Sequence, residues 1–365
     1  MVVLARLLAL LLVALSLAGG VAGGLLRACT APVPDTTGAW LVSAAVYHAA
    51  LMIGGFLGTV IAFERAVALE RRVAFVAPLA SSLGGALILL SHPAAGAWLL
   101  VAASVAFIGV NIAVLQRQNA SHTRLLLVAA GAWLAGNLFL AGGDGAAALC
   151  WWFAFLVATI AAERLEMTRL TRRGAEVEPL LWNVMAVMLG GAALAPSAAA
   201  LGGALFGMSL VGLSAWLFAF DVARRTVRVA GLSRYMAVCL LTGYAWLALA
   251  GLAWTAMAAG LPTRDAALHA LGLGFVVSMM MAHAPVIVPA VTRIKVRFGP
   301  YFYVPLAVLE LSLVVRLGFG HADLLVRGLG ALLNAVALGI FALTILGAAI
   351  AWRLMANERK AQKAM

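Results

Sequence analysis

The sequence predicts an all-α integral membrane protein, a bundle of twelve transmembrane helices with its N- and C-termini in the cytoplasm. Its composition, its recurring apolar stretches and its one-sided distribution of cations lead to this prediction. The chain has 365 residues, of which 65% are hydrophobic and only 10% are charged. Soluble domains are roughly half apolar and about a quarter charged, so the composition suits lipid as the solvent.

Apolar stretches long enough to cross a bilayer recur along the whole chain, since about 20 apolar residues in a helix span the hydrocarbon core. The expected spans are residues 3–25, 39–63, 74–92, 95–115, 124–142, 146–163, 180–195, 198–220, 235–258, 266–290, 301–318 and 324–352. The loops between them are too short to fold alone. We therefore expect residues 1–365 to form a single transmembrane domain, within which residues 1–170 and 171–365 could form two six-helix halves.

The first span, MVVLARLLALLLVALSLAGG, has a second interpretation as a signal peptide that is cleaved after export. Cleavage would leave eleven spans and would keep every later loop on the same side of the membrane. We favour a retained helix, and the alternative stays open at this point.

Positive charge separates the two sides of the membrane. With the N-terminus inside, nearly all of the 25 Lys and Arg residues fall at inner helix ends, and only Arg27, Arg264 and Arg327 fall outside. Arg316 lies within or near the outer end of a span. Because cytoplasmic loops collect Lys and Arg, this asymmetry predicts a multi-pass protein of the bacterial inner (cytoplasmic) membrane. The net charge of +12 is then matched by lipid headgroups, and we expect no nucleic-acid partner.

Ionisable side chains inside membrane spans suggest function, because hydrocarbon does not solvate them. His48 is expected roughly 13 Å below the outer boundary, and His269 roughly 6 Å below it. Imidazole is a good ligand for haem iron and copper, and two imidazoles from separate helices can bind one metal centre. The alternative is a hydrogen bond from each histidine to a neighbouring helix, and spacing alone does not choose between the two.

His283 and Glu310 belong to the middle or inner half of the membrane. His283 follows His269 on the same helical face but about 21 Å further along, so the two histidines cannot share a metal ion. Pro285 and Pro289 follow and remove backbone donors, which suits either a polar transport site or a structural kink. A carboxylate at mid-depth needs a partner or a proton, and we expect Glu310 to lie within about 8 Å of His283.

Residues 241–281, LTGYAWLALAGLAWTAMAAGLPTRDAALHALGLGFVVSMMM, resemble a segment of the NnrS family. These are twelve-span bacterial membrane proteins, related in plan to the catalytic subunit of haem-copper oxidases. The stretch YHAALMIGGFLGTVIAF also resembles the second helix of the family, which reads H-x-H-E-M. This chain departs from that motif, because one histidine and the glutamate are replaced, and it lacks the G-H-T-G-R ending of the family.

The resemblance implies a haem- and/or copper-binding membrane protein that binds or reduces a diatomic gas such as nitric oxide, or that carries electrons. It makes His48 and His269 candidate ligands of haem or a metal, and His283 a candidate ligand of a remodelled metal site. A small gas ligand and a redox partner would accompany this function. Whether the protein is an enzyme stays open.

Two other classes of function remain as alternatives. A proton-coupled secondary transporter would use a mid-membrane site at His283 and Glu310. An assembly factor for a respiratory complex would need none of these side chains for chemistry.

Overall fold

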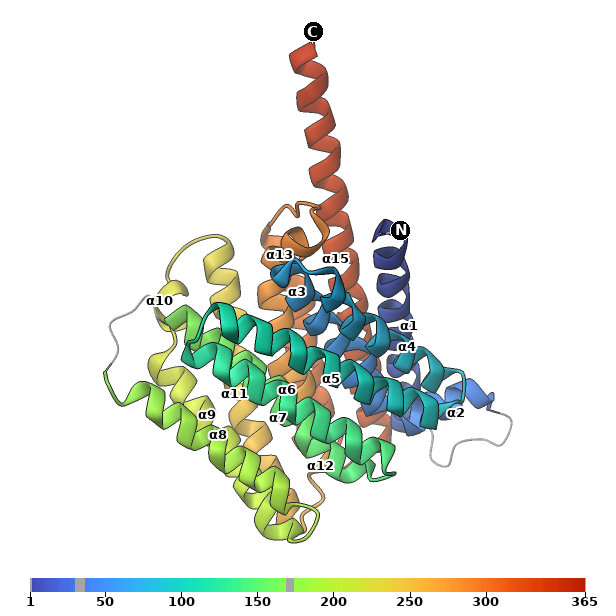
Figure 1. The fold of residues 1–365 in the computed structure, drawn as a ribbon, viewed down its shortest axis with the longest axis vertical. Coiled ribbons are helices and arrows are strands. Elements are labelled where there is room, and N and C mark those ends of the chain that lie inside the picture. Colours follow the sequence, from blue (N-terminus) through green and yellow to red (C-terminus); the bar gives the residue numbers. More distant parts are fainter. Residues whose placement is uncertain (1, 30–36, 169–173, 365) are drawn as a thin grey trace. The chain divides into compact units, whose positions relative to one another are not determined.

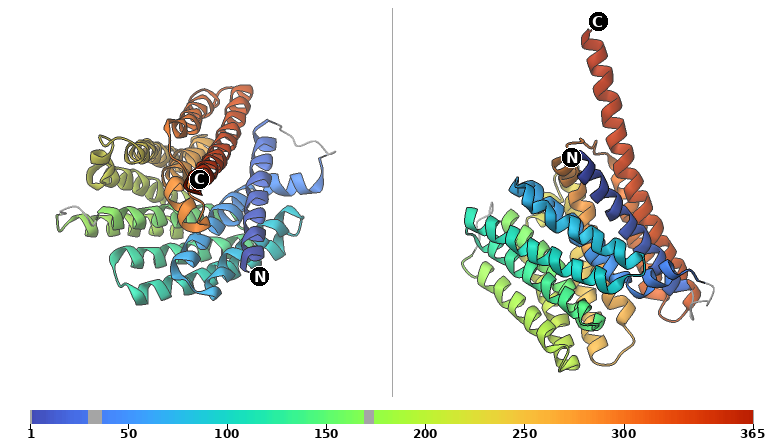
Figure 2. Two further views of the ribbon diagram at one scale, coloured as in Figure 1. Left: turned by 90° about the horizontal axis from the view of Figure 1, so that it is seen from above. Right: turned by 45° about the vertical axis from the view of Figure 1, so that its right-hand side comes forward.

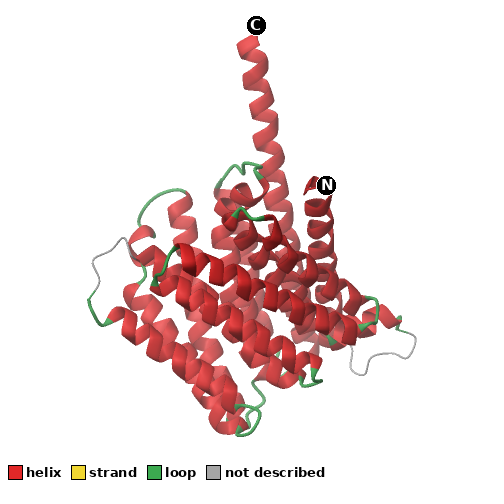
Figure 3. Cartoon of the chain, viewed as in Figure 1, coloured by secondary structure: helices red, strands yellow, loops and turns green. Residues whose placement is uncertain are grey.

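The computed structural model describes residues 2–29, 37–168 and 174–364, and Figure 1 traces these residues along the chain. The described residues form helices joined by loops, and no strand occurs among them (Figure 3). Within this part of the chain, 12 helices are long and apolar enough to cross a membrane. The predicted number of spans and the helical multi-pass class are thereby confirmed.

Ten of the spans begin within three residues of the predicted positions, whereas the first and the second begin eight and eleven residues later than predicted. The spans are Leu11–Cys29, Ala50–Leu69, Arg72–Leu89, Pro93–Arg117, Ser121–Ala141, Gly145–Met167, Val177–Leu194, Ala199–Phe220, Leu232–Ala258, Arg264–Ala290, Pro300–Phe319 and Leu324–Met355.

The chain divides into two compact units. Unit 1 comprises Met1–Glu166 and Trp182–Phe206, and unit 2 comprises Met167–Leu181 and Gly207–Met365. Helices α8 (Val177–Leu194) and α9 (Ala199–Phe220) each contribute residues to both units. The two six-helix halves that the sequence suggested, residues 1–170 and 171–365, stay a prediction.

Unit 1 also contains the helices that precede α8. They are α1 (Val2–Cys29), α2 (Ala39–Val46), the π-helix η1 (Ala50–Gly58), α3 (Thr59–Leu69), η2 (Arg72–Phe75), α4 (Val76–Leu89), α5 (Pro93–Arg117), α6 (Ser121–Ala141) and α7 (Gly145–Met167).

The interior of unit 1 joins α5, α6 and α7. The ring of Trp133 stacks on Phe155, with 5.1 Å between the ring centroids, and meets Phe107 edge-on at 5.4 Å. Asn137 donates to the Leu100 carbonyl at 2.8 Å and accepts from the indole of Trp152 at 2.9 Å. Apolar packing and interhelical hydrogen bonds are the forces that hold helices together in lipid.

A close approach of α4 to α5 depends on two glycines. A Cβ atom on Gly96 would lie 2.6 Å from the Gly84 carbonyl oxygen, and a Cβ atom on Gly84 would lie 2.9 Å from the Gly96 oxygen. Small residues allow such backbone contact between membrane helices, where any side chain would force them apart.

Unit 2 contains α10 (Ala223–Thr226), α11 (Leu232–Ala258), α12 (Arg264–His269), the π-helix η4 (Ala270–Val277), α13 (Ser278–Thr292), η5 (Pro300–Phe302), α14 (Tyr303–Leu313), the π-helix η6 (Val314–Phe319) and α15 (Leu324–Ala364). Helix α15 is the longest, and its C-terminal part extends past the loop between α13 and η5 (Figure 2). Helix α11 packs against α12, η4 and α13.

The second span departs from the continuous helix that we expected over residues 39–63. Tyr47 leaves the helical conformation after α2, with φ −99° and ψ 23°, and the candidate span begins at Ala50. His48 therefore lies at the joint between α2 and η1, just before the span, and not a third of the way into an uninterrupted helix. The prediction of one continuous helix over residues 39–63 is therefore wrong, and the depth of His48, which was derived from it, stays a prediction.

Helix α13 continues through Pro285 and Pro289 to Thr292, so the prolines do not end it. Pro285 lacks the N–H that would normally bond the carbonyl of Met281 one turn earlier. The Tyr235 hydroxyl of α11 donates to that carbonyl at 3.3 Å. A side chain from a neighbouring helix thus satisfies an acceptor that the proline leaves without its helical donor.

Candidate functional site

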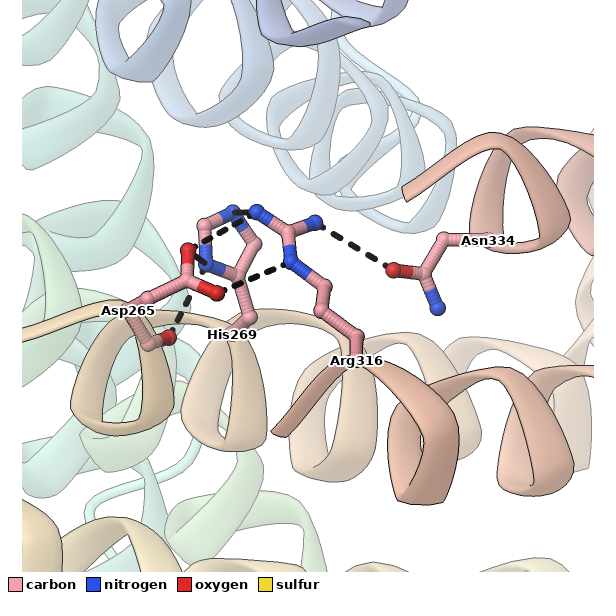
Figure 4. A network of polar contacts seen from close by, with 4 residues as sticks. All are labelled: Asp265, His269, Arg316 and Asn334. Carbon is pink, nitrogen blue, oxygen red and sulfur yellow. Dashed lines mark hydrogen bonds and ion pairs between the residues drawn. The ribbon is translucent and has the colours of Figure 1, made fainter. Parts of the chain in front are cut away.

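An ionic network at one end of the unit 2 spans joins α12, η6 and α15 (Figure 4). Arg316 lies in η6, and its side chain is only 9% exposed. Its Nε donates to one carboxylate oxygen of Asp265 at 3.0 Å, and its Nη2 donates to the other at 2.8 Å. Two parallel bonds between a guanidinium and a carboxylate form the strongest and most directional type of protein ion pair.

The same guanidinium fixes the hydrogen positions on His269. Arg316 Nη2 lies 3.2 Å from His269 Nε2, and a guanidinium has only donors. Nε2 must therefore accept, which leaves the ring hydrogen on Nδ1. Nδ1 lies 3.0 Å from the Asp265 carboxylate and 3.0 Å from the Asp265 carbonyl, both of which are acceptors. His269 is a neutral imidazole in this arrangement, with both nitrogens in hydrogen bonds.

Asn334 of α15 completes the network. Its Oδ1 accepts from Arg316 Nη1 at 3.2 Å, and its Nδ2 donates to the Ser312 hydroxyl at 2.6 Å. Ser312 in turn donates to the Leu309 carbonyl at 2.7 Å. Two charges of opposite sign and three polar groups thus satisfy one another within apolar surroundings, as buried polar groups must.

A second polar cluster surrounds Glu310 at mid-membrane depth. Glu310 lies about ten residues from either end of the span Pro300–Phe319, which places it about 15 Å from each end. Its Oε2 accepts from the indole N–H of Trp246 at 2.5 Å, and its Oε1 accepts from the Ser278 hydroxyl at 3.5 Å. Within the described residues, Glu310 has no salt-bridge partner.

His283 follows Ser278 on α13, and its Nδ1 donates to the Met279 carbonyl at 2.7 Å. The expected approach of His283 to Glu310 within about 8 Å stays a prediction. His48 makes a comparable contact in unit 1, where its Nδ1 donates to the Gly20 carbonyl of α1 at 2.7 Å. His48 and His269 belong to different units, so a metal centre shared by them also stays a prediction.

The three histidines differ in how well they suit a haem iron or copper ion. A ligating imidazole usually donates from one nitrogen to a carbonyl or carboxylate and presents the lone pair of the other. His48 and His283 are tied at Nδ1 in this manner. His269 does not fit as it stands, because Arg316 donates to its Nε2 and would place a positive charge beside the metal. Among the described residues, no three His, Cys, Asp or Glu side chains are grouped as a metal centre would need.

Sequence reasoning did not anticipate the roles of Arg316, Asp265 and Trp246, although one signal was present. Arg316 stands alone in an apolar span, and a lone membrane cation requires a partner at the same depth. Asp265, at the start of the preceding span, is expected at that level. The role of Trp246 had no such signal, because the indole looks like any other apolar ring in a span. Asn334 of α15 bonds Arg316 of η6 and Ser312 of α14 and so joins α15 to the preceding span.

The structure thus defines a helical multi-pass membrane protein that carries a partly buried ionic network and a separate carboxylate at mid-membrane depth. The model of one family, described as a domain of unknown function (DUF8744), matches residues 6–350. Since this match covers nearly the whole chain, the chain belongs to the DUF8744 family. Neither a curated protein nor a solved structure matches the chain.

Proposed function

We propose that this protein is a proton-coupled secondary transporter of the bacterial inner membrane, in which Glu310 takes up and releases the proton. The observation that carries the proposal is the setting of Glu310. The carboxylate lies at mid-depth and is bonded by the neutral donors Trp246 and Ser278, without a salt-bridge partner in the described chain. An ionised carboxylate in that position is costly, so it requires a proton or a bound cation.

The surroundings of Glu310 suit a group that changes its protonation state. When Glu310 is ionised, the indole N–H and the serine hydroxyl donate to its carboxylate. When Glu310 is protonated, the same two donors can still bond the carbonyl oxygen of the acid. His283, on the same helix as Ser278, is the candidate second proton group. The π-helices η4 and η6 lie on the two spans that contribute Ser278 and Glu310. Such π-helical segments occur frequently at functional sites.

The orientation belongs to the same proposal. Both termini are cytoplasmic, because an even number of spans returns the chain to its starting side and nearly all cations fall at the ends on that side. The ionic network of Asp265, His269 and Arg316 then lies near the outer surface. Glu310 lies between that network and the cytoplasm.

Infrared spectroscopy of the purified protein in lipid tests the role of Glu310 without a known substrate. We expect a carboxylic-acid carbonyl band that titrates with pH in the wild-type protein and is absent from Glu310→Gln. Glu310→Asp should retain a shifted band. The control Glu178→Gln removes an exposed glutamate from α8 and should leave the band unchanged. A wild-type spectrum identical to that of Glu310→Gln at every pH contradicts the proposal.

A second measurement tests transport. Proteoliposomes with an imposed pH gradient should show proton flux in the wild type and in Glu178→Gln but not in Glu310→Gln. Loss of flux with retained size-exclusion behaviour supports a proton-carrying role. Equal flux in all three proteins contradicts it.

The orientation of His48 favours a second candidate, an NnrS-like haem- or copper-binding protein. The 2.7 Å contact from Nδ1 to the Gly20 carbonyl is the second-shell arrangement usual for a ligating histidine. Bound haem or copper would supply gas binding or electron transfer, with His48 or His283 as ligands. A visible spectrum and metal analysis decide this. A haem band lost in His48→Ala supports the candidate, and a colourless, metal-free protein contradicts it.

A further inference from the structure

Residues 293–299 connect α13 to η5 and alternate between basic and apolar side chains. Arg293, Lys295 and Arg297 are exposed, whereas the residue after each of them, Ile294, Val296 and Phe298, is half-buried. Alternation of this kind is what an extended chain produces, because successive side chains point to opposite sides. Lys295 and Arg297 therefore share one face, and Arg293, the left-handed residue with φ 61° that ends α13, is exposed just before them. We call Arg293, Lys295 and Arg297 the basic segment.

Contacts with α15 hold the basic segment in place. The backbone N–H of Arg297 donates to the Ala348 carbonyl at 3.3 Å, and its guanidinium lies 3.3 Å from the Met355 sulfur. Lys295 Nζ lies 5.2 Å from the ring centroid of Trp352. A cation over an aromatic face is attracted by the negative ring surface. The cations are thus positioned by a neighbouring helix.

Aromatic packing anchors the apolar side of the same loop. The ring of Phe298 packs on Tyr235 and Phe302, with centroid distances of 5.5 and 5.4 Å. The Tyr301 hydroxyl donates to the Arg297 carbonyl. The loop therefore has a defined conformation, and its basic side chains extend from fixed backbone positions.

The positive charge of the basic segment is not neutralised within the protein. None of Arg293, Lys295 and Arg297 forms an ion pair with a carboxylate in the part of the chain that the structure describes. Such a row of exposed cations is open to an anion from outside the molecule.

The position of the basic segment points to the source of that anion. The segment follows the last turn of α13, and Trp352 lies near the end of the span Leu324–Met355, where aromatic residues mark the level of lipid headgroups. Two apolar side chains follow Tyr301 on one face of α14. They are Val304 and Leu311, which are seven residues apart and are 51% and 67% exposed. An acyl chain can pack against this exposed apolar face. A soluble phosphate or an acidic peptide would make no comparable apolar contact with it.

We propose that the basic segment binds the phosphate headgroup of an anionic phospholipid, with Trp352 beside the headgroup and the acyl chain along α14. Arginine forks suit phosphate oxygens, and lysine adds a point charge. Basic residues next to transmembrane helices attract anionic lipids in this way. The proposal is independent of the chemistry at Glu310.

Native mass spectrometry of the purified full chain tests the proposal with added phosphatidylglycerol or phosphatidylcholine of identical acyl chains. The wild type should bind phosphatidylglycerol more tightly. The triple variant Arg293→Gln, Lys295→Gln, Arg297→Gln should lose about tenfold or more of that affinity. The double variant Arg293→Lys, Arg297→Lys should retain it, which separates loss of charge from loss of fold.

The matched control is Arg224→Gln, Arg225→Gln, Arg228→Gln, which removes three exposed charges from α10 and the residues just after it in unit 2 and should retain the preference. Equal losses in both triple variants would mean general charge attraction and would overturn the proposal. It is also overturned if the two lipids bind alike, or if inorganic phosphate competes as effectively as phosphatidylglycerol.

Discussion

Arg316 is a buried cation in an apolar span, and every contact that it makes has a structural consequence. It pairs with Asp265 on one side, bonds Asn334 on another and fixes the tautomer of His269. These contacts join η6 and α15, which are consecutive, to α12, which lies about 50 residues earlier in the chain. The network therefore stabilises unit 2 and determines which nitrogen of His269 carries a hydrogen.

The first prediction concerns this ion pair. Arg316→Gln should lower the stability of the protein by about 3 kcal/mol, because removal of one partner leaves the other charge uncompensated in a partly buried site. The double variant Asp265→Asn, Arg316→Gln should be less destabilised than Arg316→Gln alone, since no lone charge remains. Thermal unfolding in detergent measures both, with Arg224→Gln as the exposed control. A double variant that is no more stable than Arg316→Gln alone would contradict the predicted coupling.

At the scale of elements, helix packing depends on glycines, which have no side chain, and on prolines, which have no backbone N–H. Gly84 and Gly96 bring α4 and α5 into backbone contact. Pro285 leaves a carbonyl that Tyr235 satisfies from α11. The π-helices η1 and η4 begin close after His48 and His269, and η6 contains Arg316. Local irregularity thus accompanies three of the polar side chains in or beside the spans.

The second prediction tests the close approach of α4 and α5. Gly96→Ala should destabilise the protein by about 1–3 kcal/mol, because its Cβ atom would overlap the Gly84 carbonyl and force the helices apart. Gly109→Ala, on the same helix, has open space around the added carbon. It should be neutral or slightly stabilising, because alanine is the better helix former. Unfolding temperatures of the two variants compare them directly, and equal temperatures would contradict the assigned contact.

The third prediction concerns the proline helix. Tyr235→Phe should cost about 1 kcal/mol, the usual value of one hydrogen bond. In a Pro285→Ala background the restored backbone N–H can bond the Met281 carbonyl, so the same tyrosine substitution should cost less. A thermodynamic cycle of the four proteins gives the coupling. An unchanged cost in the alanine background would show that the hydroxyl does not serve this carbonyl.

At the scale of the whole molecule, twelve apolar helices and a one-sided cation distribution describe a protein whose surroundings are lipid. The proposed orientation places both ends of the chain on the basic side. This is also the side on which the basic segment lies.

The fourth prediction tests that orientation. A fluorescent protein fused after residue 365 should fluoresce in bacteria, because its chromophore matures in the cytoplasm. Alkaline phosphatase fused at the same position should be inactive, since it requires export. The opposite pair of results would place the C-terminus outside and would remove the proposed topology. A fusion after Asp144, in a loop expected outside, should give active phosphatase as the control.

The sequence by itself determined the class of this protein. The length of each apolar stretch and the positions of the cations can be read from consecutive residues. They therefore predicted twelve helical spans without any knowledge of packing. They also identified Glu310 and three histidines as polar groups in or beside apolar helices. The same local reasoning treated the second span as continuous, because nothing in its composition marks the interruption at Tyr47.

Only the tertiary structure decided which of these polar groups meet. Asp265 and Arg316 are 51 residues apart in the chain, too far for a local sequence pattern to pair them. The guanidinium nevertheless reaches both the carboxylate and His269 in the folded protein. Trp246 likewise reaches Glu310 across 64 residues. Hydrogen bonds act over about 3 Å, whereas sequence patterns report only which face of a helix is apolar. Partners on different helices are therefore determined by packing.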